Sequence, residues 1–419
     1  MNGSVPLQGD SLPDMGAAHR PERYRWLMLF VAFLSQNMAV GLTFASVGLL
    51  MEPLAADLEG SRSLLSLSIA LVILANGLLG PLVGALVDRW SLRGTMMIGT
   101  LLGAIGFLGA SQAASTGVYL LFYGVFVGLG FAMMGVLPAN KIITLWFPHT
   151  IGRVSGFVNV PLFNMIGPPV YALIIVAAGW RTLLIVFAAS YLLLMLLCWL
   201  IRTPERAPGE QAATKSAGAE TVEHAPFKSP VFWILCLVYG LLMSSGITVI
   251  THAAPNAQDH GIVLTQASIL MSILGVCGII GNFLFGWVCD RFTPFVALVS
   301  NAGLQAAMWL LLGNTDAFVP MAVAIAGIGL CSAGVVPIFI AVLSKAYDPG
   351  QFGRLYGMVG LVGFPFAFGA APLAGLFFDL FGNYQFAFFV QGGLCAVTLI
   401  LTLFTRSLFR KRVTAHGKG

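Results

Sequence analysis

Scattered polar side chains interrupt long apolar stretches of this chain. They bring amides, hydroxyls, one amine and one imidazole, which bind a solute through hydrogen bonds or charge. Because a polar side chain inside an apolar segment is costly unless it faces a cavity or a partner, such residues mark candidate sites. The candidates for solute binding are Gln36, Asn37, Lys141, Asn164, Tyr239, Ser244, His252 and Asn282.

Each candidate also has a structural interpretation. A mid-helix amide or hydroxyl often serves only to join two helices, an effect of about 0.6 kcal/mol on average. Lys141 can extend its amine to an aqueous end, and His252 can be a wetted helix cap. His252 is nevertheless the leading proton carrier, because an imidazole changes its charge near neutral pH.

Motifs of enzymatic chemistry are missing from the sequence. It contains no Walker lysine motif, no nucleophile elbow and no cluster of His or Cys with metal-ligand spacing. The six cysteines form no CxxC pair, so neither a disulfide framework nor a zinc site is predicted. We therefore expect no catalytic residue, no metal and no cofactor.

The elements that must position these side chains are membrane-spanning helices. The chain has 419 residues, of which 58% are hydrophobic and only 9% charged, whereas soluble proteins carry about 25% charged residues. A helix that crosses a bilayer needs roughly 20 apolar residues. The pattern predicts twelve such helices, near 26–50, 63–87, 95–113, 117–146, 154–178, 181–201, 230–253, 264–288, 293–312, 316–345, 354–380 and 384–408.

The basic residues orient these helices. Of the 21 Lys and Arg residues, all but Arg62 and Arg181 fall on one side of the predicted membrane. The positive-inside rule makes that side cytoplasmic, together with both termini. The net charge of +5 follows from this bias, so it predicts no nucleic-acid partner.

A polar stretch divides the chain into two halves. Its Ala, Pro, Glu and Thr content is typical of a flexible linker. The predicted organisation is a cytoplasmic N-terminal tail at 1–25, a six-helix bundle at 26–201, a cytoplasmic linker at 202–229, a second six-helix bundle at 230–408 and a cytoplasmic C-terminal tail at 409–419.

The two halves also repeat one another. GALVDR at 84–89 recurs as GWVCDR at 286–291, and GVLP at 135–138 recurs as GVVP at 334–337. The order and the separation are nearly the same in each case, which indicates a duplication. Parallel repeats of this kind place a solute site near the bilayer midplane, where the halves meet.

These motifs resemble the major facilitator superfamily. GALVDRWSLRG at 84–94 is similar to the loop between helices 2 and 3 of that family. Further stretches resemble its monocarboxylate and oxalate–formate branch: 146–169 followed by GWR at 179–181, then 252–267 and 356–388. The resemblance implies an all-α membrane protein of two pseudo-symmetric six-helix bundles that moves a small molecule by alternating access. We expect it in a bacterial inner membrane, with protons as a candidate coupling ion; the oligomeric state is not predicted.

One departure from that branch bears on the substrate. In the branch, helix 8 usually carries an Arg that binds the substrate carboxylate, and monocarboxylate members have an Asp four residues before it. This chain has Asn282 and Gly278 at those positions. Two substrate classes therefore stay open: a small organic acid, with a monocarboxylate as the first choice, and a neutral or hydrophobic compound. A membrane receptor or sensor is the alternative outside transport.

The resemblance and the repeat also suggest moving parts. An Asp facing an Arg across the two loop motifs would form a latch at the cytoplasmic end. Glycine and proline inside helices 5 and 11 favour bending there. The predicted gating residues are Gly84, Asp88, Arg89, Arg93, Gly286, Asp290 and Arg291, and the predicted hinge residues are Gly167, Pro168, Gly363 and Pro365.

Overall fold

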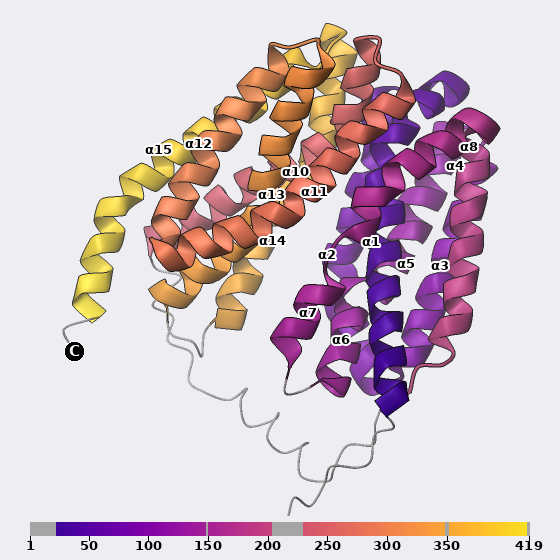
Figure 1. Ribbon diagram of the computed structural model, residues 1–419, viewed down its shortest axis with the longest axis horizontal. Helices are drawn as coiled ribbons and strands as arrows, with labels where there is room; N and C mark the ends of the chain where they lie inside the picture. Colours follow the sequence, from indigo (N-terminus) through magenta and orange to yellow (C-terminus); the bar gives the residue numbers. More distant parts are fainter. Residues whose placement is uncertain (1–21, 148–149, 203–228, 348–351, 417–419) are drawn as a thin grey trace, which may run out of the picture.

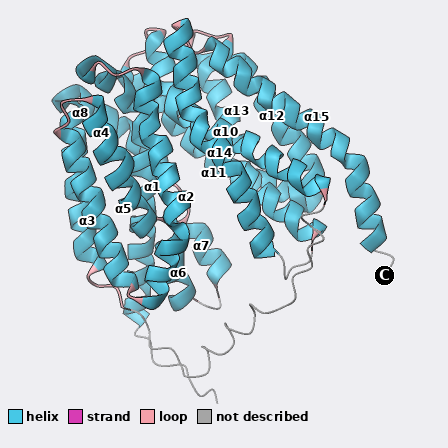
Figure 2. Ribbon diagram, turned by 180° about the vertical axis from the view of Figure 1, so that it is seen from behind, coloured by secondary structure: helices cyan, strands magenta, loops and turns pink. Residues whose placement is uncertain are grey.

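Helices are the only regular secondary structure in the described residues of the structure, a computed structural model (Figure 2). It describes residues 22–147, 150–202, 229–347 and 352–416. The first half contains α1 (Glu22–Leu58), α2 (Arg62–Arg89), α3 (Leu92–Ser111), α4 (Thr116–Tyr119), the π-helical stretch η1 (Leu120–Val127), α5 (Gly128–Met134), α6 (Val136–Trp146), α7 (Ile151–Val158) and α8 (Leu162–Cys198). The second half contains α10 (Pro230–Asp259), α11 (Leu264–Arg291), α12 (Pro294–Gly313), α13 (Phe318–Ala346), α14 (Phe352–Phe381) and α15 (Gln385–His416).

Side-chain caps and glycine turns set where several helices begin and end. Ser61 caps α2 by accepting a hydrogen bond from the backbone N–H of Leu64, a role for which serine is strongly preferred. Gly382 follows α14 with φ 72°, a conformation that L-residues rarely adopt. This turn brings the start of α15 back beside the end of α14.

The described part contains 11 helical segments that are long and apolar enough to cross a membrane. This confirms the prediction of an all-α chain with many long apolar helices. One segment, Val154–Cys198, has 45 residues, which at 1.5 Å per residue is about 67 Å, or roughly two bilayer cores. Gly179 inside it has φ 82° and ψ 162°, so its backbone is not helical and α8 consists of two helices that meet there.

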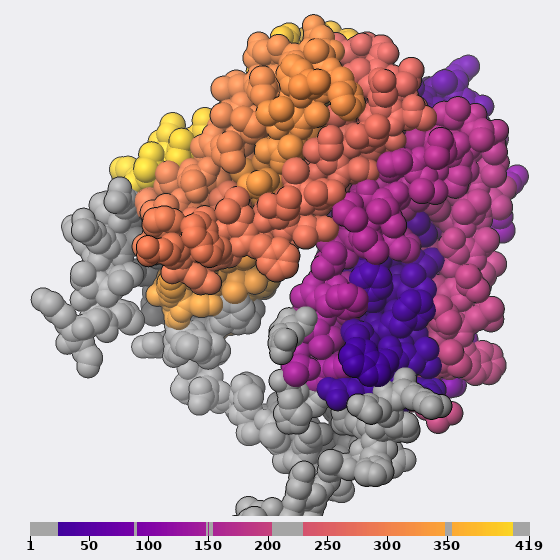
Figure 3. Space-filling model, viewed as in Figure 1, coloured from indigo at the N-terminus to yellow at the C-terminus, as the bar shows by residue number. Residues whose placement is uncertain are grey.

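The helices form two groups that correspond to the two halves of the chain (Figure 1). Across the boundary, α1 packs on α10, α2 on α14, and α8 on α11. We call the end of the molecule with Glu22, Arg202 and Ser229 the linker end, and the end with Arg62 and Asp259 the far end. The halves touch around the far end, and a hollow separates them toward the linker end (Figure 3).

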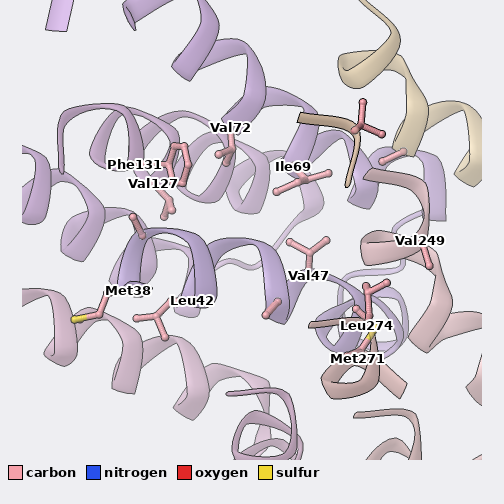
Figure 4. Packing of buried hydrophobic residues seen from close by; sticks show 14 of the residues in the cluster. Met38, Leu42, Val47, Ile69, Val72, Val127, Phe131, Val249, Met271 and Leu274 are labelled. Carbon is pink, nitrogen blue, oxygen red and sulfur yellow. The ribbon is translucent and has the colours of Figure 1, made fainter. Parts of the chain in front are cut away.

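The packed interior of the first half continues toward the boundary with the second. Apolar side chains of α1, α2 and α5 pack together on one side, and those of α10 and α11 lie beside them (Figure 4). Burial of this kind in a membrane gains mainly from close packing, because lipid tails are as apolar as the core. The labelled residues of this cluster are Met38, Leu42, Val47, Ile69, Val72, Val127, Phe131, Val249, Met271 and Leu274.

Candidate functional site

A cavity of about 170 Å³ lies between the two halves, near the middle of the helices. One wall comes from α1 and the segment around the start of α8, and the other from α10, α11 and α13. The lining residues are Ala45, Pro161, Asn164, Gly246, Val249, Ile250, Met271, Leu274, Gly275, Gly278, Asn282, Gly329, Ser332 and Ala333. The volume suits a small organic molecule.

Three polar side chains line this cavity: Asn164, Asn282 and Ser332. Within the described residues, Asn164 Oδ1 and Ser332 Oγ are buried and have no hydrogen-bond partner. Buried polar atoms are normally paired, since leaving one unpaired costs about 1–3 kcal/mol. A solute or a water that bonds to them would remove this cost. All the described side chains that line the cavity are uncharged.

Close backbone packing closes the cavity toward the far end. A Cβ atom at Gly275 of α11 would lie 2.8 Å from the carbonyl oxygen of Asn164, and one at Gly48 of α1 would lie 3.0 Å from that of Ile250. Farther out, a Cβ at Gly375 of α14 would lie 2.7 Å from the carbonyl oxygen of Arg62. Glycine permits these close approaches, so the backbones of the two halves pack directly against each other there.

Arg62 joins the halves at the far end. Its Nη1 and Nη2 each donate to one carboxylate oxygen of Asp259 at 2.6 Å, and Nη2 also donates to Glu52 at 2.9 Å. Its guanidinium carbon lies 3.9 Å from the ring centre of Phe378. Arg62 is only 8% exposed, so these charge-assisted bonds are shielded from competing water. Asp259 and Phe378 belong to the second half, which makes Arg62 a bridge between the bundles.

Asp379 strengthens the same bridge through the backbone. Its two carboxylate oxygens accept hydrogen bonds from the backbone N–H groups of Arg62 at 3.0 Å and Ser63 at 3.1 Å. These N–H groups open α2 and have no acceptor within their own helix. A carboxylate at a helix N-terminus also gains from the helix dipole. A residue of α14 thus caps a helix of the other half.

His252 takes part in this far-end network. Tyr384 accepts a hydrogen bond from Arg62 Nη1 at 3.0 Å, and its hydroxyl lies 3.1 Å from His252 Nδ1. The other imidazole nitrogen, Nε2, lies 2.9 Å from the carbonyl oxygen of Ala371. His252 is fully buried. We name Glu52, Arg62, His252, Asp259, Asp379 and Tyr384 the far-end network.

Arg181, the second far-end arginine, forms its hydrogen bonds within the first bundle. Arg181 Nη2 donates to Asp57 at 2.7 Å, and Nη1 donates to the carbonyl oxygens of Ser111 and Ala113. Asp57 also accepts from Trp180. All these groups belong to the first half. Arg181 therefore connects helices within the first half, whereas Arg62 connects the two halves.

Two of the predicted solute-binding residues line the cavity together: Asn164 of α8 in the first half and Asn282 of α11 in the second. Asn37 instead donates to the Phe33 carbonyl and accepts from the backbone N–H of Phe163. Ser244 is bonded to Gln391.

The remaining candidates also lie away from the cavity lining. Tyr239 packs edge-on against Phe339. Gln36 is buried in α1, and its Oε1 has no partner among the described residues. Lys141 lies in α6, and His252 lies in the far-end network.

The predicted gating residues lie at the linker end. The backbone of Asp88 and Arg89 ends α2, but their side chains lie outside the described residues. Arg93, Asp290 and Arg291 are exposed. A Cβ atom added at Gly84 or Gly286 would meet open space. These two glycines therefore face the hollow or the bilayer in this conformation.

The predicted hinge residues lie inside helices. Gly167 and Pro168 are in the first half of α8, and Gly363 and Pro365 are in α14. Gly363 packs against α10, where the Cα of Gly240 lies 3.4 Å from a Cβ built at Gly363. Bending at these positions stays a prediction.

Sequence reasoning missed Arg62 and its partners Asp259, Asp379 and Tyr384. The available signal was charge placement: one of only two far-end arginines, with acidic residues at the same ends of second-half helices. Such a lone cation attracts carboxylates. Nothing in the spacing indicated which of them it would choose.

Two helical bundles with a cavity between them, closed at one end by an ion-pair network, have the layout of secondary transporters that are built from two repeats. The family model described as Major Facilitator Superfamily matches residues 26–256 and 243–419. The chain belongs to the Major Facilitator Superfamily. It is a multi-pass integral membrane protein and, as its family and relatives are transporters, it is not an enzyme.

Curated relatives cover most of the chain at low identity. An uncharacterized MFS-type transporter, YcxA of Bacillus subtilis (strain 168), is 25% identical over 387 residues, covering 86% of this chain and 90% of the relative. Monocarboxylate transporter 12 of Mus musculus is 25% identical over 372 residues, covering 80% and 76%. The resemblance to monocarboxylate transporters is thus confirmed.

Solved structures share the fold. A D-xylose–proton symporter superimposes with a TM-score of 0.75 at 16% identity, covering 90% of this chain and 97% of the symporter. A bacterial homolog of the human lysosomal transporter Spinster, in an inward-facing and unoccupied conformation, gives a TM-score of 0.72 at 16% identity, covering 94% and 98%. These likenesses concern the fold alone.

Proposed function

We propose that this protein is a secondary transporter that carries a small solute by alternating access. The observation that supports this most is the Arg62 bridge, which holds the two bundles together on one side of the cavity. Rocking of the bundles would break this bridge and expose the cavity to the far side. A receptor would bind a solute at the same cavity without moving it, so counterflow in proteoliposomes distinguishes the two functions.

We further propose that the linker end is cytoplasmic, which makes the described conformation inward-facing. The bias of Lys and Arg toward that end supports the orientation. The break at Gly179 supports two crossings by the Val154–Cys198 segment. The proposed topology therefore has twelve crossings in two bundles, at 26–201 and 230–408, with cytoplasmic tails and linker and a bacterial inner membrane as the location.

The first candidate substrate is a short monocarboxylate, which the names of the curated relatives support. An undissociated acid would suit Asn164, Asn282 and Ser332 without any cation, and it would bring its own coupling proton. The second candidate is a neutral small molecule, which the uncharged lining of the cavity favours. Proton symport and exchange are both compatible with these candidates.

Asn282→Arg tests the substrate class. L-Lactate and L-lactamide are nearly isosteric, but only lactate is anionic at neutral pH. Since a hydrogen bond to a charged group contributes about 1.5–3 kcal/mol, we expect the arginine to tighten lactate binding about tenfold or more and to abolish lactamide counterflow. The measurement is counterflow of each labelled compound in proteoliposomes.

Asn282→Gln is the matched control, because it keeps the amide. It should retain the wild-type preference between lactate and lactamide. If Asn282→Arg leaves the transport of both compounds unchanged, Asn282 does not lie on the solute path. If neither compound is transported by the wild type, a wider panel of neutral solutes and acids is required before the class is assigned.

The latch predicted at the linker end remains a proposal. If Asp88 holds the closed state of that end, Asp88→Asn should slow transport several-fold, because a neutral amide bonds an Arg more weakly than a carboxylate does. Solute protection of a thiol introduced by Ser332→Cys should stay as in the parent. Wild-type transport rates in Asp88→Asn would contradict the latch, and Asp290→Asn is the matched change in the second half.

A further inference from the structure

A chain of polar contacts leads from the far-end surface to the buried imidazole of His252. It begins at Glu52 and Asp259, whose side chains are 47% and 26% exposed. It continues through Arg62 and the Tyr384 hydroxyl and ends at His252. The cavity lining does not include His252. This imidazole is therefore available for a role in the network.

The partners of His252 define its tautomer. The carbonyl oxygen of Ala371 can only accept, so Nε2 must carry a proton to bond it at 2.9 Å. In a neutral imidazole Nδ1 then has a lone pair, and the Tyr384 O–H donates to it. The Tyr384 oxygen meanwhile accepts from Arg62. Every group in this chain has its complementary partner while His252 is neutral.

Proton uptake by His252 would disturb that arrangement. The new proton would occupy Nδ1 and point at the Tyr384 oxygen, so the Tyr384 O–H would have to turn elsewhere. Its other contact is the thioether of Met51 at 3.7 Å, which is a weak acceptor. The imidazolium and the guanidinium of Arg62 would then face one hydroxyl oxygen, with their nearest nitrogens no more than about 6 Å apart.

Other charged groups around His252 come from each neighbouring helix. The carboxylates of Glu52 and Asp259 are bonded to Arg62 side-chain nitrogens, and that of Asp379 is bonded to backbone N–H groups. The titratable and charged groups facing the network in the described residues are Glu52 of α1, Arg62 of α2, Asp259 of α10, Asp379 of α14 and Tyr384 at the start of α15, with His260 paired to Asp316 nearby.

We propose that His252 is a proton-binding residue that controls the far-end gate. The gate is closed when His252 is neutral. A proton taken from the aqueous phase at the far end binds Nδ1, places a second positive charge beside Arg62 and favours separation of the halves. This inference rests on the proposed alternating access and adds to it the site at which a proton acts on the conformational change.

Distances between spin labels test the proposal without knowledge of the substrate. The labels go on Ala114→Cys in the first half and Ala317→Cys in the second, both exposed at the far end. Cys277 is replaced by Ala, because it is the one native cysteine that is not buried. We expect the long-distance population to rise at least about twofold between about pH 8 and about pH 5.5. In His252→Gln the population should not change with pH.

Glutamine is chosen because its amide can still donate to the Ala371 carbonyl but takes up no proton. The matched control is His260→Gln on the same helix, which should keep the wild-type response. If His252→Gln does not fold, Tyr384→Phe provides the second test. It keeps the ring but removes the bridging hydroxyl, and it should also abolish the pH response.

The outcomes separate this inference from the proposed function. A full pH response in His252→Gln overturns the inference, as does its loss in His260→Gln alone. Arg62→Ala should lengthen the distance at every pH. If it does so while His252→Gln still responds to pH, the Arg62 bridge stands and only the role of His252 is wrong. If Arg62→Ala changes no distance, the Arg62 bridge does not hold the far end closed and the inference fails with it.

Discussion

Arg62→Ala should open the far end of the protein and lower transport at least about tenfold. The substitution leaves Asp259 and Glu52 without their guanidinium partner. Breaking a fully buried ion pair costs about 3–5 kcal/mol, and the partial exposure of these two carboxylates lowers that cost. Since about 1.4 kcal/mol is a factor of ten in an equilibrium, even part of that cost would shift the balance strongly away from the closed far end. A transporter held in one conformation completes few cycles.

The measurement is access to the cavity from the far side. A thiol introduced by Ser332→Cys lines the cavity and should react with a membrane-impermeant reagent added at the far side once Arg62 is replaced. Arg62→Lys should give an intermediate result, because an ammonium keeps the charge but cannot form the two parallel bonds to Asp259.

Arg181→Ala is the matched control, as it removes the other far-end arginine. Its partners all lie within the first half, so it should lower stability without exposing the cavity thiol. Equal reactivity of the Ser332→Cys thiol in the parent and in Arg62→Ala would show that Arg62 does not hold the halves together.

Gly375→Leu should lower transport at least about thirtyfold. A Cβ atom at this position would lie 2.7 Å from the backbone nitrogen and Cα of Ser63, closer than real contacts allow, and overpacking typically costs about 1–3 kcal/mol. The new side chain would force α14 away from α2. The far end could then no longer close, although each bundle could still fold.

Counterflow rates and the reactivity of the Ser332→Cys thiol measure this effect together. Gly375→Ala should give a smaller loss, since it adds one carbon atom. Gly393→Leu is the control, because a Cβ at Gly393 of α15 meets no atom within 4 Å. Wild-type transport in Gly375→Leu would mean that α2 and α14 need not approach each other during the cycle.

Most of the fold followed from apolar segment length and from the internal repeat. Segment length depends on neighbouring residues alone, and the repeat is read by comparing the two halves of the sequence, so neither signal requires knowledge of tertiary contacts. The GWR stretch at 179–181 illustrates this: the sequence predicts separate helices at 154–178 and 181–201, and the backbone breaks at Gly179. In the first half, one predicted helix at 117–146 instead contains a π-helical stretch and a break at Gly135.

The candidate site was only partly predictable. Asn164 and Asn282 line the cavity together, because mid-helix amides are costly in hydrocarbon and tend to face a polar space. The same reasoning applies to Asn37, yet its amide donates to the Phe33 carbonyl and accepts from the backbone N–H of Phe163 at the start of α8. A polar residue that binds solute and one that joins helices look alike in sequence, and only packing separates them.

The far-end network was harder still to foresee. Arg62 and Asp259 are 197 residues apart in the chain, and no periodicity links them. Their contact depends on the relative orientation of the two complete bundles, which is a property of one conformation of the protein. Another conformation of the same sequence would separate them.

The hydrogen bonds between Asp379 and the start of α2 report whether the far end of the protein is open or closed. The backbone N–H groups of Arg62 and Ser63 are bonded to this carboxylate of the other half, so they lose their acceptor whenever the bundles part at the far end. Amide hydrogen exchange depends on such openings. The deuterium uptake of a peptide that contains these two residues would therefore report how often the unlabelled, unmutated protein opens, at any pH and with any solute.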